Sequence, residues 1–205
     1  IYTKLLLKQA NNPELFVTKR ESMIKHLSLI ESETKRCGDI VKGLLDFSRK
    51  DQNDFEPKHL HEILKETYEL MTHPIRIANI SFRYDFLANA DLIYCNPNQI
   101  KQACIAMLVN ASEAMTENGE IIIRTMNPDT ESVIFEIADN GVGIAEEDLS
   151  HIFEPFFSTK QDVRGIGLGL AIVHGIVQNH KGRIHVDSEL NRGTTFSINL
   201  PLIKS

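Results

Sequence analysis

The first quarter of the chain repeats apolar side chains at helical spacing. Residues 1 to about 11 are amphipathic, Asn11, Asn12 and Pro13 interrupt the pattern, and a longer helix is predicted from about residue 14 to 49. In this longer helix, seven positions recur at alternating spacings of four and three residues: Met23, Leu27, Ile30, Thr34, Cys37, Val41 and Leu44. A single hairpin covers such a heptad seam poorly. The pattern therefore predicts a helical hairpin that forms half of a dimeric four-helix bundle.

The spacing of apolar residues changes after the polar segment 51–57, which ends in proline and is interpreted as a linker. We expect helices over about 59–73, 97–116 and 168–180, and strands over 80–86, 91–95, 119–126, 132–139, 183–189 and 194–201. Strands in hairpins with helices between them predict an α+β sandwich, a mixed sheet with helices on one face. The predicted domains are 1–57, the helical hairpin and linker, and 58–205.

Composition narrows the class of protein. No stretch of the 205 residues approaches the roughly 20 apolar residues that cross a bilayer, and no signal segment opens the chain, so we expect a cytoplasmic fragment without membrane contact. The net charge of -6 argues against nucleic acid as a partner. Cys37, Cys95 and Cys104 lack paired metal-ligand spacing, and reduced thiols are expected.

The segment DNGVGI, residues 139–144, is a candidate contact for a flat ligand. Gly141 and Gly143 would let the backbone approach such a ligand closely. The carboxylate of Asp139 can accept a hydrogen bond from an exocyclic amine such as that of adenine. A tight turn is the alternative interpretation.

The segment GIGLGL, residues 165–170, precedes a predicted helix. Gly165, Gly167 and Gly169, with Leu168 among them, leave backbone amides exposed at the positive end of that helix, which favours phosphate. A flexible loop is the alternative. The chain has neither a strand directly before this segment nor a Walker-type GxxxxGK[ST] sequence.

Between the two glycine segments lies FEPFFSTK, residues 153–160. Three phenylalanines are too many for a solvated loop, so at least two are expected to pack on the core. Lys160 then stands where a cation could reach a triphosphate, and Arg164 could add a second cation. Either could also be an ordinary surface charge.

The helix before these segments carries MLVNASEAM, residues 107–115. Asn110 and Glu113 share one face of this helix, and both are candidates for catalytic roles. An amide oxygen such as that of Asn110 is a plausible ligand for Mg²⁺, which takes few protein oxygens and fills its remaining positions with phosphate and water. A buried asparagine that caps its neighbours is the alternative.

The order and spacing of these segments, together with GTTFSINLP at 193–201, resemble the GHKL nucleotide-binding fold of sensor histidine kinases over about residues 58–202. The resemblance implies that Asp139 binds the adenine amine, that Asn110 holds Mg²⁺, and that the segment between Asp139 and the glycine helix is a lid over ATP. It also implies that Thr194 helps to read adenine, directly or through water.

The segment TKRCGDIVKGLLDFSRK, residues 34–50, is similar to the dimerisation and phosphoacceptor domain of the same family. Its phosphoacceptor histidine would then precede Ile1. The NNP at 11–13 has no His-Glu before it, so it is not interpreted as the histidine box. His26 lacks a following acid and is expected to lie on a solvated helix face, and no other histidine gains a role.

One departure from the family pattern bears on mechanism. Position 106, where hydrolytic members carry a water-activating Glu and many histidine kinases a second Asn, is Ala106. The resemblance therefore implies that this chain activates water weakly and supplies fewer ligands to the metal ion.

The resemblance therefore implies transfer of the γ-phosphoryl of ATP to that upstream histidine, for relay to an aspartate of a response-regulator receiver domain. A homodimer through the hairpin is the expected assembly. The alternatives are a GHKL ATPase that drives a conformational cycle, a nonenzymatic dimerisation or docking module, and a serine kinase of the anti-sigma type.

Overall fold

The computed structural model describes residues 21–28, 30, 55–115, 119–158 and 167–203, and the chain divides into two compact units, Ile1–Arg49 and Lys50–Ser205. In the first unit, residues 21–28 and 30 are helical. Met23 of the predicted seam is buried, whereas Leu27 is 54% exposed. The later seam positions and the predicted hairpin turn lie outside the described residues.

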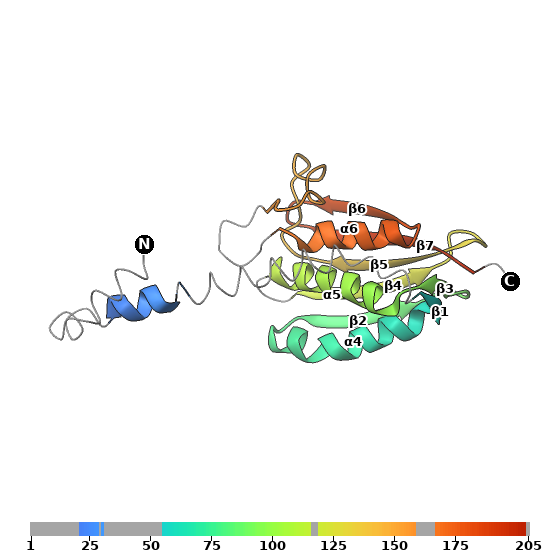
Figure 1. Cartoon of the computed structure of the whole chain (residues 1–205), viewed down its shortest axis with the longest axis horizontal. Coiled ribbons are helices and arrows are strands. Elements are labelled where there is room, and N and C mark those ends of the chain that lie inside the picture. The colour runs from blue at the N-terminus through green and yellow to red at the C-terminus, as the bar shows by residue number, and fades with distance from the viewer. Residues whose placement is uncertain (1–20, 29, 31–54, 116–118, 159–166, 204–205) are drawn as a thin grey trace. The chain divides into compact units, whose positions relative to one another are not determined.

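The second unit is α+β, as the sequence predicts, and its elements are named in Figure 1. The helices are α4 (Leu60–Ile77), α5 (Pro97–Glu113) and α6 (Gly169–Asn179). The strands are β1 (Glu56–His59), β2 (Ser81–Phe86), β3 (Leu92–Cys95), β4 (Glu120–Met126), β5 (Ser132–Asp139), β6 (Arg183–Glu189) and β7 (Gly193–Pro201).

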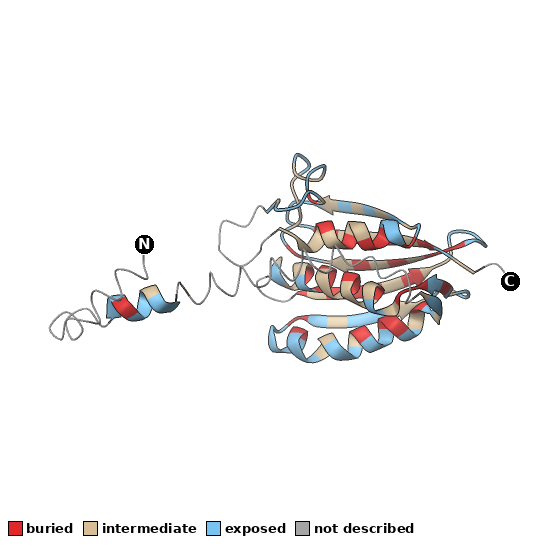
Figure 2. Ribbon diagram, viewed as in Figure 1, coloured by how far each residue is buried: buried red, intermediate tan, exposed pale blue. Residues whose placement is uncertain are grey.

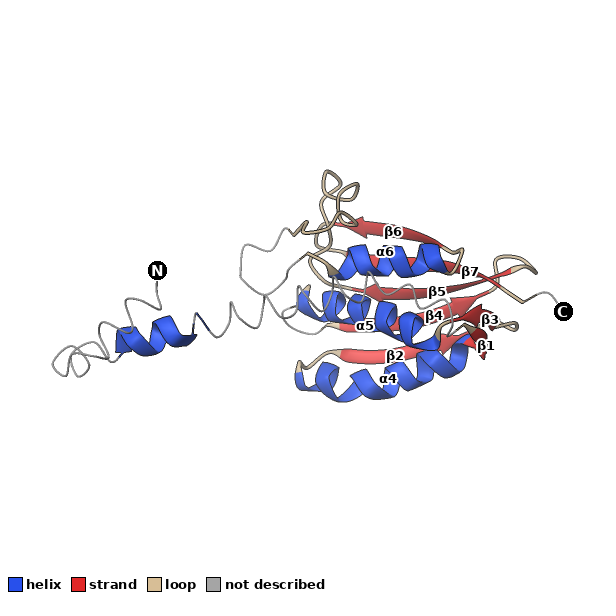
Figure 3. Ribbon diagram, viewed as in Figure 1, coloured by secondary structure: helices blue, strands red, loops and turns tan. Residues whose placement is uncertain are grey.

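Five strands form one mixed sheet in the order β2-β4-β5-β7-β6. β2 runs parallel to β4, and every other neighbouring pair is antiparallel. β1 and β3 form a separate antiparallel pair. The three helices lie side by side across one face of the five-stranded sheet (Figure 3), which confirms the predicted arrangement.

Alternation along the strands divides the sheet into a buried and an open face. Ile121, Phe135 and Ile198 point to the helical side and are at most 1% exposed, and Figure 2 shows buried residues on both the helices and the strands. The open side carries polar neighbours, including Glu136, whose carboxylate accepts a hydrogen bond from the Ser197 hydroxyl. The core therefore lies in one layer, between the sheet and the helices.

The first helix of this unit begins against a loop that is distant in sequence. His59, at the N-cap of α4, makes no side-chain cap. Instead, the backbone N–H of His61 donates to the Asp91 carboxylate at 3.0 Å, and that of Leu60 donates to the Asp91 carbonyl at 2.8 Å. These two bonds to Asp91 take the place of a local N-cap, because the residue at the N-cap position, His59, is not one of the usual capping residues. β1 in turn begins at Glu56, inside the segment interpreted as the linker.

His180 joins two helix ends. Its Nδ1 bonds the Ile176 carbonyl at 2.8 Å, and its Nε2 accepts from the backbone N–H of Asn96, the N-cap of α5, at 3.0 Å. The ring also stacks on Phe55, with centroids 4.6 Å apart. Burial lowers the pKa of His180, so the neutral ring that these contacts require is favoured.

The cysteines of the described part are free and buried, as expected from their spacing. Burial raises the pKa of Cys95 to about 11 and that of Cys104 to about 12, so both thiols stay protonated at neutral pH. Cys37 lies outside the described residues. Of the helices that the structure describes, none combines the length and apolar character needed to cross a membrane.

The environment of His180 predicts a pH-dependent stability. Its folded-state pKa lies below the ordinary histidine value of 6.5, so its contribution to stability is fully present above that value and is lost as the pH falls from there through the lower folded-state pKa. We expect His180→Ala to lower the free energy of unfolding by about 2–4 kcal/mol at about pH 8, and by less at about pH 5.5. Urea denaturation at both pH values, with the exposed His73→Ala as control, would test this. An equal loss at both pH values would contradict it.

Candidate nucleotide site

Asp139, the last residue of β5, lies where β5, its following loop and β7 meet. Its carboxylate accepts a hydrogen bond from the Gly141 N–H at 2.8 Å, and Thr194 is its cross-strand partner on β7. Burial raises the pKa of Asp139, and the backbone N–H groups of Gly141 and Thr194 oppose that rise. The carboxylate is thus half-buried, oriented by backbone amides and able to accept further hydrogen bonds.

The loop after Asp139 is fixed to the end of α5. The Val142 N–H donates to the Ala114 carbonyl at 3.0 Å. A Cβ at Gly141 would lie 2.8 Å from both Cβ and O of Ala114, closer than real contacts. Glycine at 141 is therefore required for this close packing, and an ordinary surface turn does not explain it.

The other side of the loop is fixed to the turn between β6 and β7. The Asn191 N–H donates to the Val142 carbonyl at 2.8 Å, and the Ile144 N–H donates to the Ser188 hydroxyl at 2.8 Å. Gly143 has φ +70°, and a Cβ there would collide with the Glu189 carbonyl. Gly141 and Gly143 of DNGVGI thus both allow neighbouring backbone to approach this loop closely.

The predicted metal ligand and the second glycine segment also meet. Asn110 lies near the C-terminal end of α5, and Gly169 is the first residue of α6. A Cβ on Gly169 would be 3.9 Å from Asn110 Nδ2. Leu168 is the N-cap of α6 and gives no side-chain cap, so the first amides of the helix are available to an anion. The structure therefore unites two segments that are far apart in sequence.

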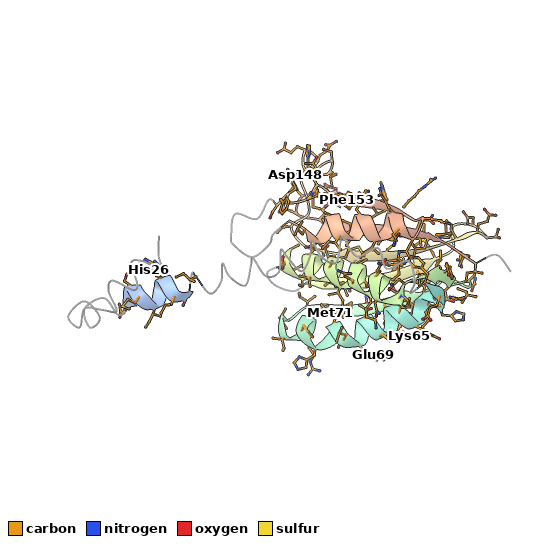
Figure 4. All side chains as sticks on the ribbon, viewed as in Figure 1. His26, Lys65, Glu69, Met71, Asp148 and Phe153 are labelled. Carbon is orange, nitrogen blue, oxygen red and sulfur yellow. The ribbon has the colours of Figure 1, made fainter. Side chains whose placement is uncertain are left out.

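The phenylalanine segment lies beside α6. Phe153, labelled in Figure 4, has its ring 5.3 Å from that of His174 on α6, and both Phe153 and Phe157 pack on the core as expected. Phe156 differs: it is 60% exposed and has φ +71°, unusual for a bulky residue. Its N–H donates to the carbonyl of Gly167, which also has positive φ, so a hydrogen bond links residues 156 and 167.

Some predicted site residues stay untested. Lys160, Arg164 and Gly165 lie outside the described residues. Glu113 is exposed, on the last turn of α5. No group of histidine, cysteine and acidic residues suited to a metal occurs in the described part of the chain, so a cation here would depend on amide, phosphate and water oxygens.

Ser188 and Asn191 were missed by sequence reasoning. Both contact the DNGVGI loop from the β6–β7 hairpin. The turn residues Asn191 and Gly193 could have indicated a hairpin but not its partner loop, because that contact depends on strand order.

Residues 95–204 match the family described as histidine kinase-, DNA gyrase B-, and HSP90-like ATPase. The chain belongs to this family. An ATPase family accounts for a site that combines a half-buried carboxylate with a helix N-terminus that has no side-chain cap.

Among curated relatives, sporulation kinase E of Bacillus subtilis (strain 168) is 35% identical over 177 residues, which are 86% of this chain and 24% of that protein. Sensor kinase CckA of Brucella abortus (strain 2308) is 34% identical over 186 residues, 84% of this chain and 20% of that protein. The chain thus spans a quarter or less of these relatives.

Among solved structures, the catalytic domain of histidine kinase ThkA is 34% identical, with a TM-score of 0.64 over 72% of this chain and 95% of that one. Histidine kinase ThkA in complex with response regulator protein TrrA is 27% identical, with a TM-score of 0.73 over 98% of this chain and 57% of that one. The fold of residues 55–203 is therefore that of histidine kinase catalytic domains.

The close packing around Gly193 predicts that adding a single methyl group at this position destabilises the fold. Gly193 has φ +108°, and a Cβ there would collide with the Asp139 carbonyl. We expect Gly193→Ala to lower the free energy of unfolding by about 2–4 kcal/mol, since strain and overlap add. Gly169→Ala is the matched control, because its Cβ meets only Asn110 Nδ2 at 3.9 Å. Equal urea midpoints for the two variants would refute the packing argument.

Proposed function

We propose that residues 55–203 bind ATP with its adenine at Asp139 and Thr194 and its phosphates at the N-terminus of α6. The observation that carries this is the meeting of Asn110 with Gly169, beside a half-buried carboxylate whose loop needs glycine. The adenine amine would donate to Asp139. The amides at Gly167, Leu168 and Gly169 would face the triphosphate, as would Lys160, Arg164 and Gly165 from the lid.

Asn110 would hold Mg²⁺ through its amide oxygen. The structure supports this because the side-chain amide lies beside the first turn of α6 and, in the described part of the chain, makes no hydrogen bond of its own. Mg²⁺ fits a single amide ligand, since phosphate oxygens and water complete its shell. When bound, it would neutralise charge that develops on the phosphates.

The proposed reaction is transfer of the γ-phosphoryl to a histidine that precedes Ile1, as in a sensor histidine kinase. Positioning and charge neutralisation supply most of the catalysis of phosphoryl transfer, so few reactive side chains are needed. Ala106, one turn before Asn110, offers no carboxylate to activate water. Glu113, close to Asn110 on α5, is a proposed contributor to this reaction.

The proposed partners are a second copy of the chain and a response-regulator receiver domain. The 54% exposure of Leu27 within a heptad pattern supports dimerisation through the first unit. The complex of ThkA with TrrA supports the receiver domain. The proposed location is the cytoplasm.

A phosphotransfer assay tests this function. The chain would be mixed with γ-labelled ATP, Mg²⁺ and a histidine-bearing hairpin of a sensor kinase, with Asp139→Asn as control. We expect label on the added histidine, reduced at least about tenfold in the variant, because a neutral amide replaces the charged acceptor. Steady release of phosphate without label on histidine would favour an ATPase instead. Absence of ATP binding would favour a nonenzymatic docking module.

The small side chain at 106 gives a gain-of-binding prediction. Ala106→Asn adds an amide one turn before Asn110 on the same face of α5. We expect ATP affinity in Mg²⁺ to rise about fivefold, as one added contact of about 1 kcal/mol would give. With EDTA in place of Mg²⁺, affinity should not change.

Titration calorimetry under both conditions would measure the effect, and Ser112→Asn on the same helix is the matched control. An equal gain in EDTA, or with the control variant, would contradict a role at the metal.

A further inference from the structure

We propose that the outer edge of β2 pairs with the same edge of a second copy of this chain. The pairing is antiparallel, places Tyr84 opposite the partner's Tyr84, and joins two five-stranded sheets into one. β4 separates β2 from β5 and β7, which carry Asp139 and Thr194, so this surface is distinct from the proposed ATP site (Figure 1). The free backbone groups of β2 and the order of its side chains both support this pairing.

Among the described strands, β2 has a neighbour in the sheet on one edge alone. Along that edge, the N–H of Ser81 donates to the Gly119 carbonyl at 2.7 Å, and that of Leu87 donates to the Thr125 carbonyl at 3.0 Å. Hydrogen-bonding direction alternates along a strand, so the odd-numbered residues of β2 bond towards β4. The even-numbered residues therefore direct their N–H and C=O groups outward: Phe82, Tyr84 and Phe86.

The outer edge of β2 is open to a further strand. Of the described groups, only the hydroxyl of Tyr68 on α4 hydrogen-bonds to this edge, where it donates to the Phe82 carbonyl at 3.0 Å. A carbonyl oxygen has a second lone pair, so the same group can also accept from a partner strand. Tyr84, in the middle of the edge, is 41% exposed. Unpaired N–H and C=O groups along an edge strand are a template for pairing with another chain.

The side chains of β2 are complementary to those of a second, antiparallel β2. Phe82 and Phe86 lie two residues to either side of Tyr84, and the oppositely charged Arg83 and Asp85 lie one residue to either side. In a pair centred on Tyr84, each Arg83 is opposite the partner's Asp85, and each Phe82 is opposite the partner's Phe86. A shift of two residues in either direction would place two arginines or two aspartates opposite each other. The charges therefore specify one register, because unlike charges stabilise a cross-strand pair and like charges destabilise it.

The backbone independently selects the same centre. A residue at the centre of such a pair must direct its N–H and C=O groups outward, as Tyr84 does. Arg83 and Asp85 then form the pairs without backbone hydrogen bonds, in which Cα atoms are about 4.5 Å apart and side chains are closest. Their side chains are 50% and 42% exposed, and Arg83 also binds Glu120 of the neighbouring strand at 3.1 Å. Both charges are thus held beside the open edge.

Paired cysteines test the register, because a disulfide traps even the weak association that a small interface gives. In a Cys37→Ser background, one chain carries Arg83→Cys and a second carries Asp85→Cys, while Cys95 and Cys104 stay buried. In the proposed register the two introduced thiols lie opposite each other, at a Cα separation of about 4.5 Å that a disulfide tolerates. Either chain alone places its introduced thiols on the diagonal, about 7–8 Å apart. We expect the oxidised mixture to cross-link at least about tenfold more than either chain alone, with the bond mapped to positions 83 and 85 by mass spectrometry.

The charges supply a second test. In a Tyr84→Cys chain, which can cross-link to its own copy, Asp85→Arg would place arginines opposite each other. We expect about tenfold less cross-linking, because two attractive pairs become repulsive. Adding Arg83→Asp places opposite charges across the pair again and should restore the cross-link. Asp187→Arg on β6, at the other edge of the sheet, makes the same change of charge and should have no effect.

Equal cross-linking of the mixture and of either chain alone would overturn this register, and so would a charge swap that fails to restore the Tyr84→Cys cross-link. Absence of any cross-link in chains that circular dichroism shows to be folded would overturn the pairing and favour a different occupant of this edge. If Tyr84→Cys does not fold, the mixture of Arg83→Cys and Asp85→Cys decides alone. Binding of ATP, measured separately by calorimetry, is expected to be unchanged whichever result is obtained.

Discussion

The close approach of two backbone segments, Gly193 on β7 and the carbonyl of Asp139 on β5, is the constraint on which the rest of the site depends. No side chain fits between them, and the positive φ of Gly193 lets the turn double back at that point. The approach accompanies the pairing of Thr194 with Asp139 across the two strands. It also sets the β6–β7 turn against the DNGVGI loop, where Asn191 and Ser188 hold it.

Two helices extend this local constraint across the domain. α5 contributes Ala114 to the loop and Asn110 to the first turn of α6 at one end. At their other ends, His180 of α6 accepts the N–H of Asn96, which caps α5. The two helices are thus hydrogen-bonded at one end and lie close together at the other, where Asn110 is near Gly169.

The structure adds a packing reason to residues that the motifs selected as candidates for ligand binding. Asp139, Gly141 and Gly143 were chosen for their ability to face a ligand, and the structure shows that both glycines are also required by neighbouring backbone. Ser188 was not predicted, because a serine in an alternating strand has no distinctive pattern. Similarly, Asp91 caps α4 from a loop after β2, and no local sequence signal marks such a cap.

The sequence by itself determined the α+β class, the strands of the main sheet and the three helices on one face, since periodicity and turn residues are local properties of the chain. It also predicted which segments are candidates for nucleotide binding. The tertiary structure decided that β2 pairs in parallel with β4, that β1 begins within the expected linker, and that Asn110 meets Gly169. These features depend on strand order and on packing between segments distant in sequence, so they cannot be predicted from local sequence patterns.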